Sequence, residues 1–388
     1  MKHTHSDKLE RWLGKDVVER ISREFGSFYY PVPLNGVPGN VRVMPGGDFT
    51  GEIKAGEFFT KHDSYAVVLK KIQREAERKV KHNKALGVLL DMIKAGDKRL
   101  ASVGAFASID AVLAAFTNGK GQTLIFNKTG TASNAVANAE DLWVGTGDPA
   151  AGAAGSAAPG GRAPTAATTG AFGYKNLGGA GTGHYLNWAL QSSLPTQSLL
   201  LYDRIFDVAK TMNSTGTEAV TGVPTRYQNG TPGNDAYIGG NFCFPMNPTT
   251  VLAATAHNWT VCQYTNQDSG TGNNFPSIAG VSACTVGGVD LAISNWFMPL
   301  AAGDVGVKAL TQMQCSAAVA TGTITFVLAH PIAINACPIA NTMYFDDGLY
   351  TSLNLTHIED SACLAFLELP KGSASAVLYS GMLRMVSE

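Results

Sequence analysis

The sequence holds few of the patterns that mark a catalytic or ligand-binding site. Gly178–Gly183 resembles a phosphate-cradling loop, but no lysine follows these glycines as a P-loop requires. The eight histidines include no HxxxH or HExxH spacing for a metal on a helix. No GxSxG nucleophile elbow occurs. We therefore expect no catalytic residue, no metal site and no cofactor, and a protein that is not an enzyme.

Two further groups of reactive side chains favour structural roles. The acidic Asp346–Gly348 stretch is more typical of a turn than of a calcium site. The cysteines form no CxxC pair and mostly lie in apolar or strand-like runs. We predict reduced, buried thiols, with disulfides as the alternative. The cysteines are Cys243, Cys262, Cys284, Cys315, Cys337 and Cys363.

Charge is scarce and unevenly spread. Charged residues make up 15% of the chain, well below the roughly 25% of a typical soluble domain. Residues 1–100 hold 19 Lys and Arg against 13 Asp and Glu, whereas residues 101–388 hold 10 against 17. Between Arg226 and Lys308 there is no lysine or arginine. Such a surface favours burial against other protein, so we expect a subunit of an assembly.

Residues 1–62 are predicted to form an N-terminal helix, an extended arm and a projecting hairpin. Apolar residues recur every four positions from Leu9 to Phe25, which is typical of an amphipathic helix. Two extended stretches flank the tight turn at Pro45–Asp48, which favours a hairpin from Val41 to Ile53. The predicted assembly-interface residues are Trp12, Leu13, Val17, Ile21, Val41, Val43, Phe49 and Ile53.

Residues 63–100 are predicted to form a long basic helical region that ends near Gly96. Its lysines and arginines are suited to phosphate contact through counterion release. A solvated helix face, with Glu75 and Glu77 interleaved, is the alternative. The candidate nucleic-acid-facing residues are Lys70, Lys71, Arg74, Arg78 and Lys81.

The remainder divides by composition into two parts. Residues 101–220 are rich in Ala, Gly and Thr; the stretch 148–161 is typical of a linker, and a helix is predicted near 198–212. Residues 221–388 are predicted to be a β-rich, sandwich-like domain. Its clearest predicted strands are Trp259–Tyr264, Val289–Ile293, Gly322–Leu328 and Ala362–Leu367. The predicted fold class is therefore α+β.

The order of N-terminal arm, projecting hairpin and long helix is similar to that of phage major capsid proteins with the HK97-like fold. Phrases such as Leu201–Ile205 and Val261–Asp268 also resemble those of tailed-bacteriophage virion proteins. This resemblance implies a capsid subunit with a spine helix followed by peripheral and axial domains. Over residues 1–100 the resemblance lies in the order of the predicted elements, and beyond residue 100 it lies only in short sequence phrases.

The function expected from these observations is a self-assembling subunit of a bacteriophage capsid that encloses the genome. Its partners would be copies of itself, other virion proteins and packaged nucleic acid, without a membrane. The polar start of the sequence lacks the apolar core of a signal peptide, so we expect synthesis in the host cytoplasm and residence in the virion. A head-decoration, fibre or tail component is one alternative. A carbohydrate-binding β-sandwich adhesin, with Trp259, Trp296 and Tyr344 stacking on sugars, is another.

Overall fold

The computed structural model describes residues 29–34, 37–42, 106, 109–131, 137–228, 240–292, 294–347, 355–370 and 375–388. The chain divides into two compact units, Met1–Arg99 and Leu100–Glu388. In the first unit, β1 (Tyr29–Leu34) pairs antiparallel with β2 (Val37–Arg42). Asn35 and Gly36 separate the two strands in sequence, and this dipeptide favours a two-residue hairpin loop.

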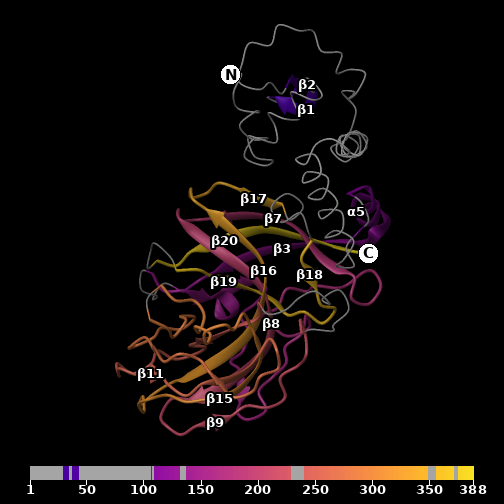
Figure 1. The fold of residues 1–388 in the computed structure, drawn as a ribbon. Coiled ribbons are helices and arrows are strands. Elements are labelled where there is room, and N and C mark those ends of the chain that lie inside the picture. Colours follow the sequence, from indigo (N-terminus) through magenta and orange to yellow (C-terminus); the bar gives the residue numbers. More distant parts are fainter. Residues whose placement is uncertain are drawn as a thin grey trace, which may run out of the picture. The chain divides into compact units, whose positions relative to one another are not determined.

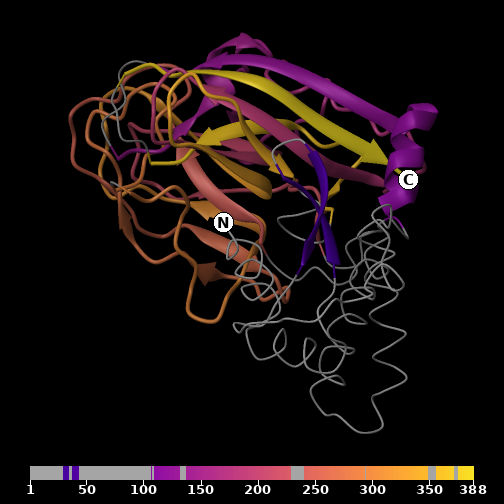
Figure 2. The ribbon, with the colours of Figure 1, turned by 90° about the horizontal axis from the view of Figure 1, so that it is seen from above.

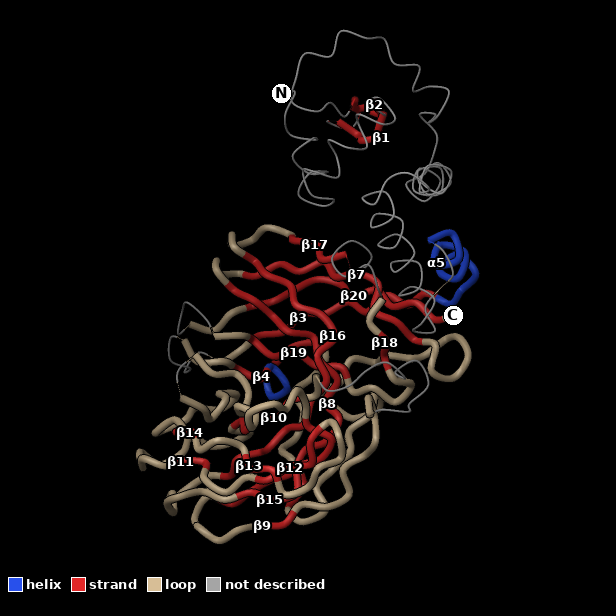
Figure 3. The backbone as a smooth tube through the Cα atoms, in the orientation of Figure 1, coloured by secondary structure: helices blue, strands red, loops and turns tan. Residues whose placement is uncertain are grey.

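The second unit is built on two mainly antiparallel sheets, each named here after one of its inner strands (Figures 1 and 3). The β7 sheet contains, in spatial order, β17 (Tyr344–Asp347), β7 (Gly183–Ser192), β20 (Leu378–Ser387), β3 (Gly121–Thr129) and β5 (Thr146–Asp148), and β18 (His357–Ile358) also pairs with β7. The β8 sheet contains β10 (Phe242–Met246), β16 (Thr323–Cys337), β8 (Gln197–Thr211), β19 (Leu364–Glu368) and β4 (Glu140–Asp141), and β6 (Ser156–Ala157) adds parallel to β8.

The pairing order of the two sheets is that of a jelly roll. Taken in chain order, β3, β4, β7, β8, β16, β17, β19 and β20 form eight principal strands. The first pairs with the last, the second with the seventh, the third with the sixth and the fourth with the fifth. A long antiparallel hairpin folded over itself into two sheets gives this order, which defines the double-sheet jelly roll.

An insertion separates the fourth and fifth principal strands. Between β8 and β16 the chain forms β9 (Glu218–Ala219), β12 (Gln263–Asn266), β13 (Asn273–Asn274) and β15 (Val307–Met313), which make one four-stranded sheet. A second, two-stranded sheet contains β11 (Asn258–Trp259) and β14 (Ile278–Ala279). β10, from the same stretch of chain, extends the edge of the β8 sheet.

Aromatic side chains fill the space between the two sheets. Trp188 of β7 stacks on Phe366 of β19 with ring centroids 4.9 Å apart and planes 1° from parallel. Phe126 of β3 meets Phe366 edge to face at 4.9 Å. Such pairs combine large apolar burial with favourable ring geometry. The two sheets are therefore held by one continuous core.

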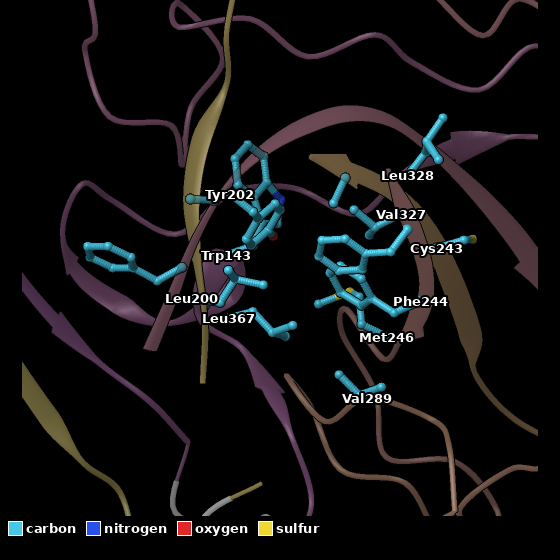
Figure 4. Close-up of a cluster of buried hydrophobic side chains, with 14 of the residues drawn as sticks. Trp143, Leu200, Tyr202, Cys243, Phe244, Met246, Val289, Val327, Leu328 and Leu367 are labelled. Atoms are coloured by element: carbon cyan, nitrogen blue, oxygen red, sulfur yellow. The ribbon is translucent and has the colours of Figure 1, made fainter. Parts of the chain in front are cut away.

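The β8 sheet is covered on both faces. Its second face carries Trp143 and Tyr202 near β8, and Phe244 and Met246 of β10 beside Val327 of β16 (Figure 4). The Ala/Gly-rich stretch after Asp148 also packs here. A Cβ on Gly152 would lie 2.1 Å from the Trp143 ring, so only glycine allows this approach. The predicted linker is thus a closely packed cover for the sheet.

The α+β fold class is wrong. The described part of the second unit is β-rich, with α5 (Ile109–Ala115) and the π-helical turn η3 (Phe116–Lys120) forming one short helical segment before β3. The helix predicted near 198–212 is the strand β8. Strands also begin at Gly121, so they are not confined to 221–388. A jelly roll replaces the HK97-like architecture for this unit, and the helices predicted within 6–25 and 63–100 lie outside the described residues.

The prediction of a helix where the chain forms the strand β8 failed for a physical reason. Nearly every residue of β8 is buried because both faces of its sheet are covered. Alternation of apolar and polar residues, the usual signature of a strand, appears only where one face meets water. Without that alternation, the apolar residues of β8 match the spacing of a helix by coincidence, and the sequence pattern favoured the wrong element.

All six cysteines are free and buried, as predicted. Burial raises the pKa of Cys262 to about 12 and that of Cys337 to about 11, which keeps both as unreactive thiols. We expect native protein to label slowly with a maleimide and to expose six reactive thiols after unfolding without reductant. Rapid native labelling, or fewer than six thiols in the unfolded chain, would contradict this expectation.

Candidate assembly interface

An apolar row crosses the outer face of the β7 sheet. Residues paired directly across antiparallel strands project from the same face. Phe345 pairs with Ala189, and Ala189 pairs with Met382. Met382 pairs in turn with Ile125, which completes a row over β17, β7, β20 and β3. We call these four residues the apolar row.

The ends of the apolar row are unusually exposed. Phe345 is 76% and Ile125 is 71% exposed, whereas Ala189 in the middle is 3% exposed. Covering each large side chain would contribute about 1.5–3 kcal/mol. Single exposed apolar residues are common on protein surfaces, whereas an aligned set across four strands makes this face a candidate contact site.

A short helix covers one end of the same sheet. Val112 and Ala115 of α5 pack with Leu186 of β7 and Val386 of β20 in a small separate core. Figure 2 shows α5 at the C-terminal end of β20, where β3 begins. Met382 lies four residues before Val386 along β20, so the apolar row lies beyond this small core.

The outward positions beside the apolar row are polar and mostly uncharged. Among the outward side chains of β3, β7 and β20, Arg384 is charged, and it pairs with Asn187 and Thr123. On the edge strand β5, the exposed Asp148 pairs with the outward Asn127. Depletion of charge around an apolar centre is typical of protein interfaces. The other polar outward residues are Asn127, Gln191 and Ser380.

Buried charges gather on the second face of the β8 sheet. Ile205 is an extra residue in the pairing of β8 with β16, and this bulge brings Arg204 and Asp207 to one face although they are three residues apart. The fully buried Arg204 donates to Asp207 Oδ2 and to Asp141 Oδ2, both at 2.8 Å. Its guanidinium lies 4.6 Å from the centre of the Trp143 ring. The network joins β8 to β4 through Asp141 and to the following turn through Trp143, so its role is structural.

Three buried histidines meet where the two sheets approach. His184 of β7 pairs across strands with His357 of β18, with ring centroids 5.8 Å apart. His330 of β16 stacks on Tyr227 at 3.8 Å, and Tyr227 lies 6.2 Å from His357. Burial lowers the pKa of His184 to about 4, with a further decrease from His357. Burial likewise lowers the pKa of His330 to about 3. Burial lowers the pKa of His357 as well, so all three rings are neutral at pH 7.

A fourth histidine forms a dyad in the insertion. His257 Nε2 lies 2.8 Å from Asp290 Oδ2, and its Nδ1 lies 3.0 Å from the carbonyl oxygen of Thr255. The hydrogen bond to Asp290 raises the pKa of His257 despite the opposing effect of burial. Asp290 also accepts the Val281 backbone N–H. Both partners are held by backbone groups, so the dyad fixes the insertion rather than forming an open site.

The residues predicted from sequence to form interfaces fall almost entirely outside the description. Val41 lies in β2 and pairs with Tyr30. The remaining predicted interface and nucleic-acid-facing residues, Trp12, Leu13, Val17, Ile21, Val43, Phe49, Ile53, Lys70, Lys71, Arg74, Arg78 and Lys81, lie outside the described residues. The apolar row was not anticipated, because its members come from four distant strands and no local pattern joins them.

The aromatic residues proposed to stack on sugars are engaged in the fold. Trp259 is 1% exposed and meets Phe326 edge to face. Trp296 packs against Phe242 with ring centroids 5.1 Å apart. Tyr344 is partly buried against the main core. These contacts give the adhesin alternative no support.

The described residues hold neither a metal-binding cluster nor a membrane-spanning helix. No group of three or more His, Cys, Asp or Glu side chains in the described ranges is placed to hold a metal ion. Within the same ranges, no helix has the length and apolar character needed to span a bilayer.

Comparison with known proteins adds little. No protein-family model matches this chain, and no curated protein matches it. Among solved structures, the chain is similar to one described as the structure of infectious bursal disease virus Gt strain. The identity is 12%, the match covers 69% of this chain and 81% of that chain, and the TM-score is 0.13. A TM-score this low carries no argument, so the jelly-roll assignment rests on the strand order alone.

Proposed function

We propose that this chain is a self-assembling structural subunit of a virion shell. Jelly rolls serve viral capsids, lectins and cupins, so the fold by itself does not select among these functions. The observation that carries the proposal is the apolar row on an outer sheet face where β3, β7 and β20 together carry one charged outward residue, Arg384. Such a face suits permanent contact with another protein surface.

Two features of the sequence support a shell subunit. The chain is poor in charge, with no lysine or arginine between Arg226 and Lys308, as expected of a surface largely covered in use. The resemblance to tailed-bacteriophage virion proteins supports a virion setting, but an HK97-like fold is not part of the proposal. The basic stretch from Lys70 to Lys81 would supply non-specific contact with a packaged genome.

Sizing of the purified full chain tests this function. We expect megadalton particles by light scattering and closed shells by negative-stain electron microscopy. A discrete small oligomer at every concentration would contradict a shell subunit. A decoration protein would also remain small when alone, but it would bind to preformed particles, so incubation with purified virions separates these two functions.

A further inference from the structure

We propose that the partner of the apolar row is the same face of a second copy of this chain. This inference rests on the proposed function, because it assigns the partner of the face that carries that function. An interface of this kind is isologous: each copy offers one patch, and the patch must be complementary to itself.

The register of the four strands provides this complementarity. Consider two copies whose outer faces meet, related by a 180° rotation about an axis that lies between the two faces, runs parallel to the strands and passes over the line between β7 and β20. In this arrangement β17 of one copy faces β3 of the other, and β7 of one copy faces β20 of the other. Phe345 of one copy then faces Ile125 of the other, so the two exposed ends of the row cover each other. Met382 then faces Ala189, which matches a long side chain to a short one. The row is large at both ends and small at Ala189, as such a pairing requires.

Charge and area both fit a second copy. Arg384, the charged outward residue of β3, β7 and β20, would face Asn187 of the other copy rather than another Arg384. Outward side chains recur at every second residue, about 6.6 Å apart along a strand, and neighbouring strands lie about 4.8 Å apart. A patch four strands wide and four outward residues long therefore has an area of roughly 500 Å² on each copy. Two copies together reach about 1,000 Å², the lower bound for a specific interface.

A single introduced cysteine can report this contact, because the six native cysteines are buried. Met382→Cys in the full chain places a thiol near the centre of the row while keeping Phe345 and Ile125. With a short bismaleimide we expect at least tenfold more covalent dimer from this variant than from Val305→Cys, an exposed position before β15 in the insertion. Adding Ile125→Asp to Met382→Cys should remove the dimer, and circular dichroism should show that the variant remains folded.

Three other outcomes would contradict the proposed contact between copies. Particles that form while Met382→Cys labels freely without cross-linking would overturn the assigned contact and leave the shell function intact. A monomer in which position 382 resists labelling would show that the chain covers this face itself, which also overturns the inference. A monomer that labels freely at 382 and forms no particles would contradict the contact and the proposed function together.

Discussion

Lowering the pH from 7.5 to 4.5 is expected to destabilise the protein through His184 and His330. Both side chains are neutral and buried in the fold, with pKa values of about 4 and about 3, against 6.5 in the unfolded chain. Between pH 6.5 and 4 the unfolded state therefore binds more protons, and the free energy of unfolding falls as pH falls. At about 1.4 kcal/mol per pH unit for each group, the pair would lose roughly 5 kcal/mol by pH 4.5.

Other titratable groups near the histidines also change the free energy of unfolding with pH, in addition to the contribution of His184 and His330. Burial raises the pKa of Glu359 and of Asp203, and a raised carboxyl pKa adds stability as pH falls. The wild-type loss therefore includes opposing contributions. The titratable and charged groups around the three rings are Tyr174, Asp203, Arg226, Tyr227, Glu359 and Asp360.

Variants isolate the histidine contribution. A chain with His184→Gln and His330→Gln should lose about 5 kcal/mol less than wild type between pH 7.5 and 4.5 in urea unfolding. His257→Gln is the matched control, because the raised pKa of His257 contributes stability that is present below pH 6.5 and lost as pH rises. That control should lose more than wild type on acidification. Equal losses in the double variant and wild type would exclude these two histidines as the source.

Replacing Arg204 by methionine is expected to lower the free energy of unfolding by about 3–5 kcal/mol, because it leaves the buried Asp141 without its cation and removes one of the two cations that contact Asp207. Asp141 would keep its hydrogen bond from the Tyr202 hydroxyl at 2.7 Å but lose its ion pair. Asp207 would keep Arg162, whose Nη2 lies 2.6 Å from Oδ2. Methionine preserves much of the packing against Trp143, so the change tests charge more than volume.

Two controls separate charge from packing. Arg162→Met removes a partly exposed cation from the same network and should cost about 1 kcal/mol or less. Combining Arg204→Met with Asp141→Asn removes the orphaned carboxylate while Asp207 keeps Arg162, and should restore most of the stability. If this double variant is no more stable than Arg204→Met alone, packing of the guanidinium, and not its charge, holds this face together.

The sequence by itself determined several local features. The strands predicted at Gly322–Leu328 and Ala362–Leu367 overlap β16 and β19. The strand predicted at Trp259–Tyr264 is wrong in extent, because it is divided between β11 and β12, and Val289 forms an isolated bridge in place of the strand predicted at Val289–Ile293. The burial of the cysteines followed from the apolar runs around them. The scarcity of charge is likewise a property of composition. The Asn35–Gly36 dipeptide between β1 and β2 also carries a local hairpin signal, which the prediction of a hairpin at Val41–Ile53 overlooked.

Only the tertiary structure decided which strands pair and which faces are covered. The jelly roll joins β3 to β20 and β4 to β19 across more than 200 residues, and no local pattern encodes such pairing. Covering both faces of the β8 sheet removed the alternation that would have identified β8. One bulge at Ile205 brought Arg204 and Asp207 together, and the register of four separate strands made the apolar row. Periodicity reports the local contrast between core and water; long-range register depends on how the whole chain closes, because every pairing constrains the next.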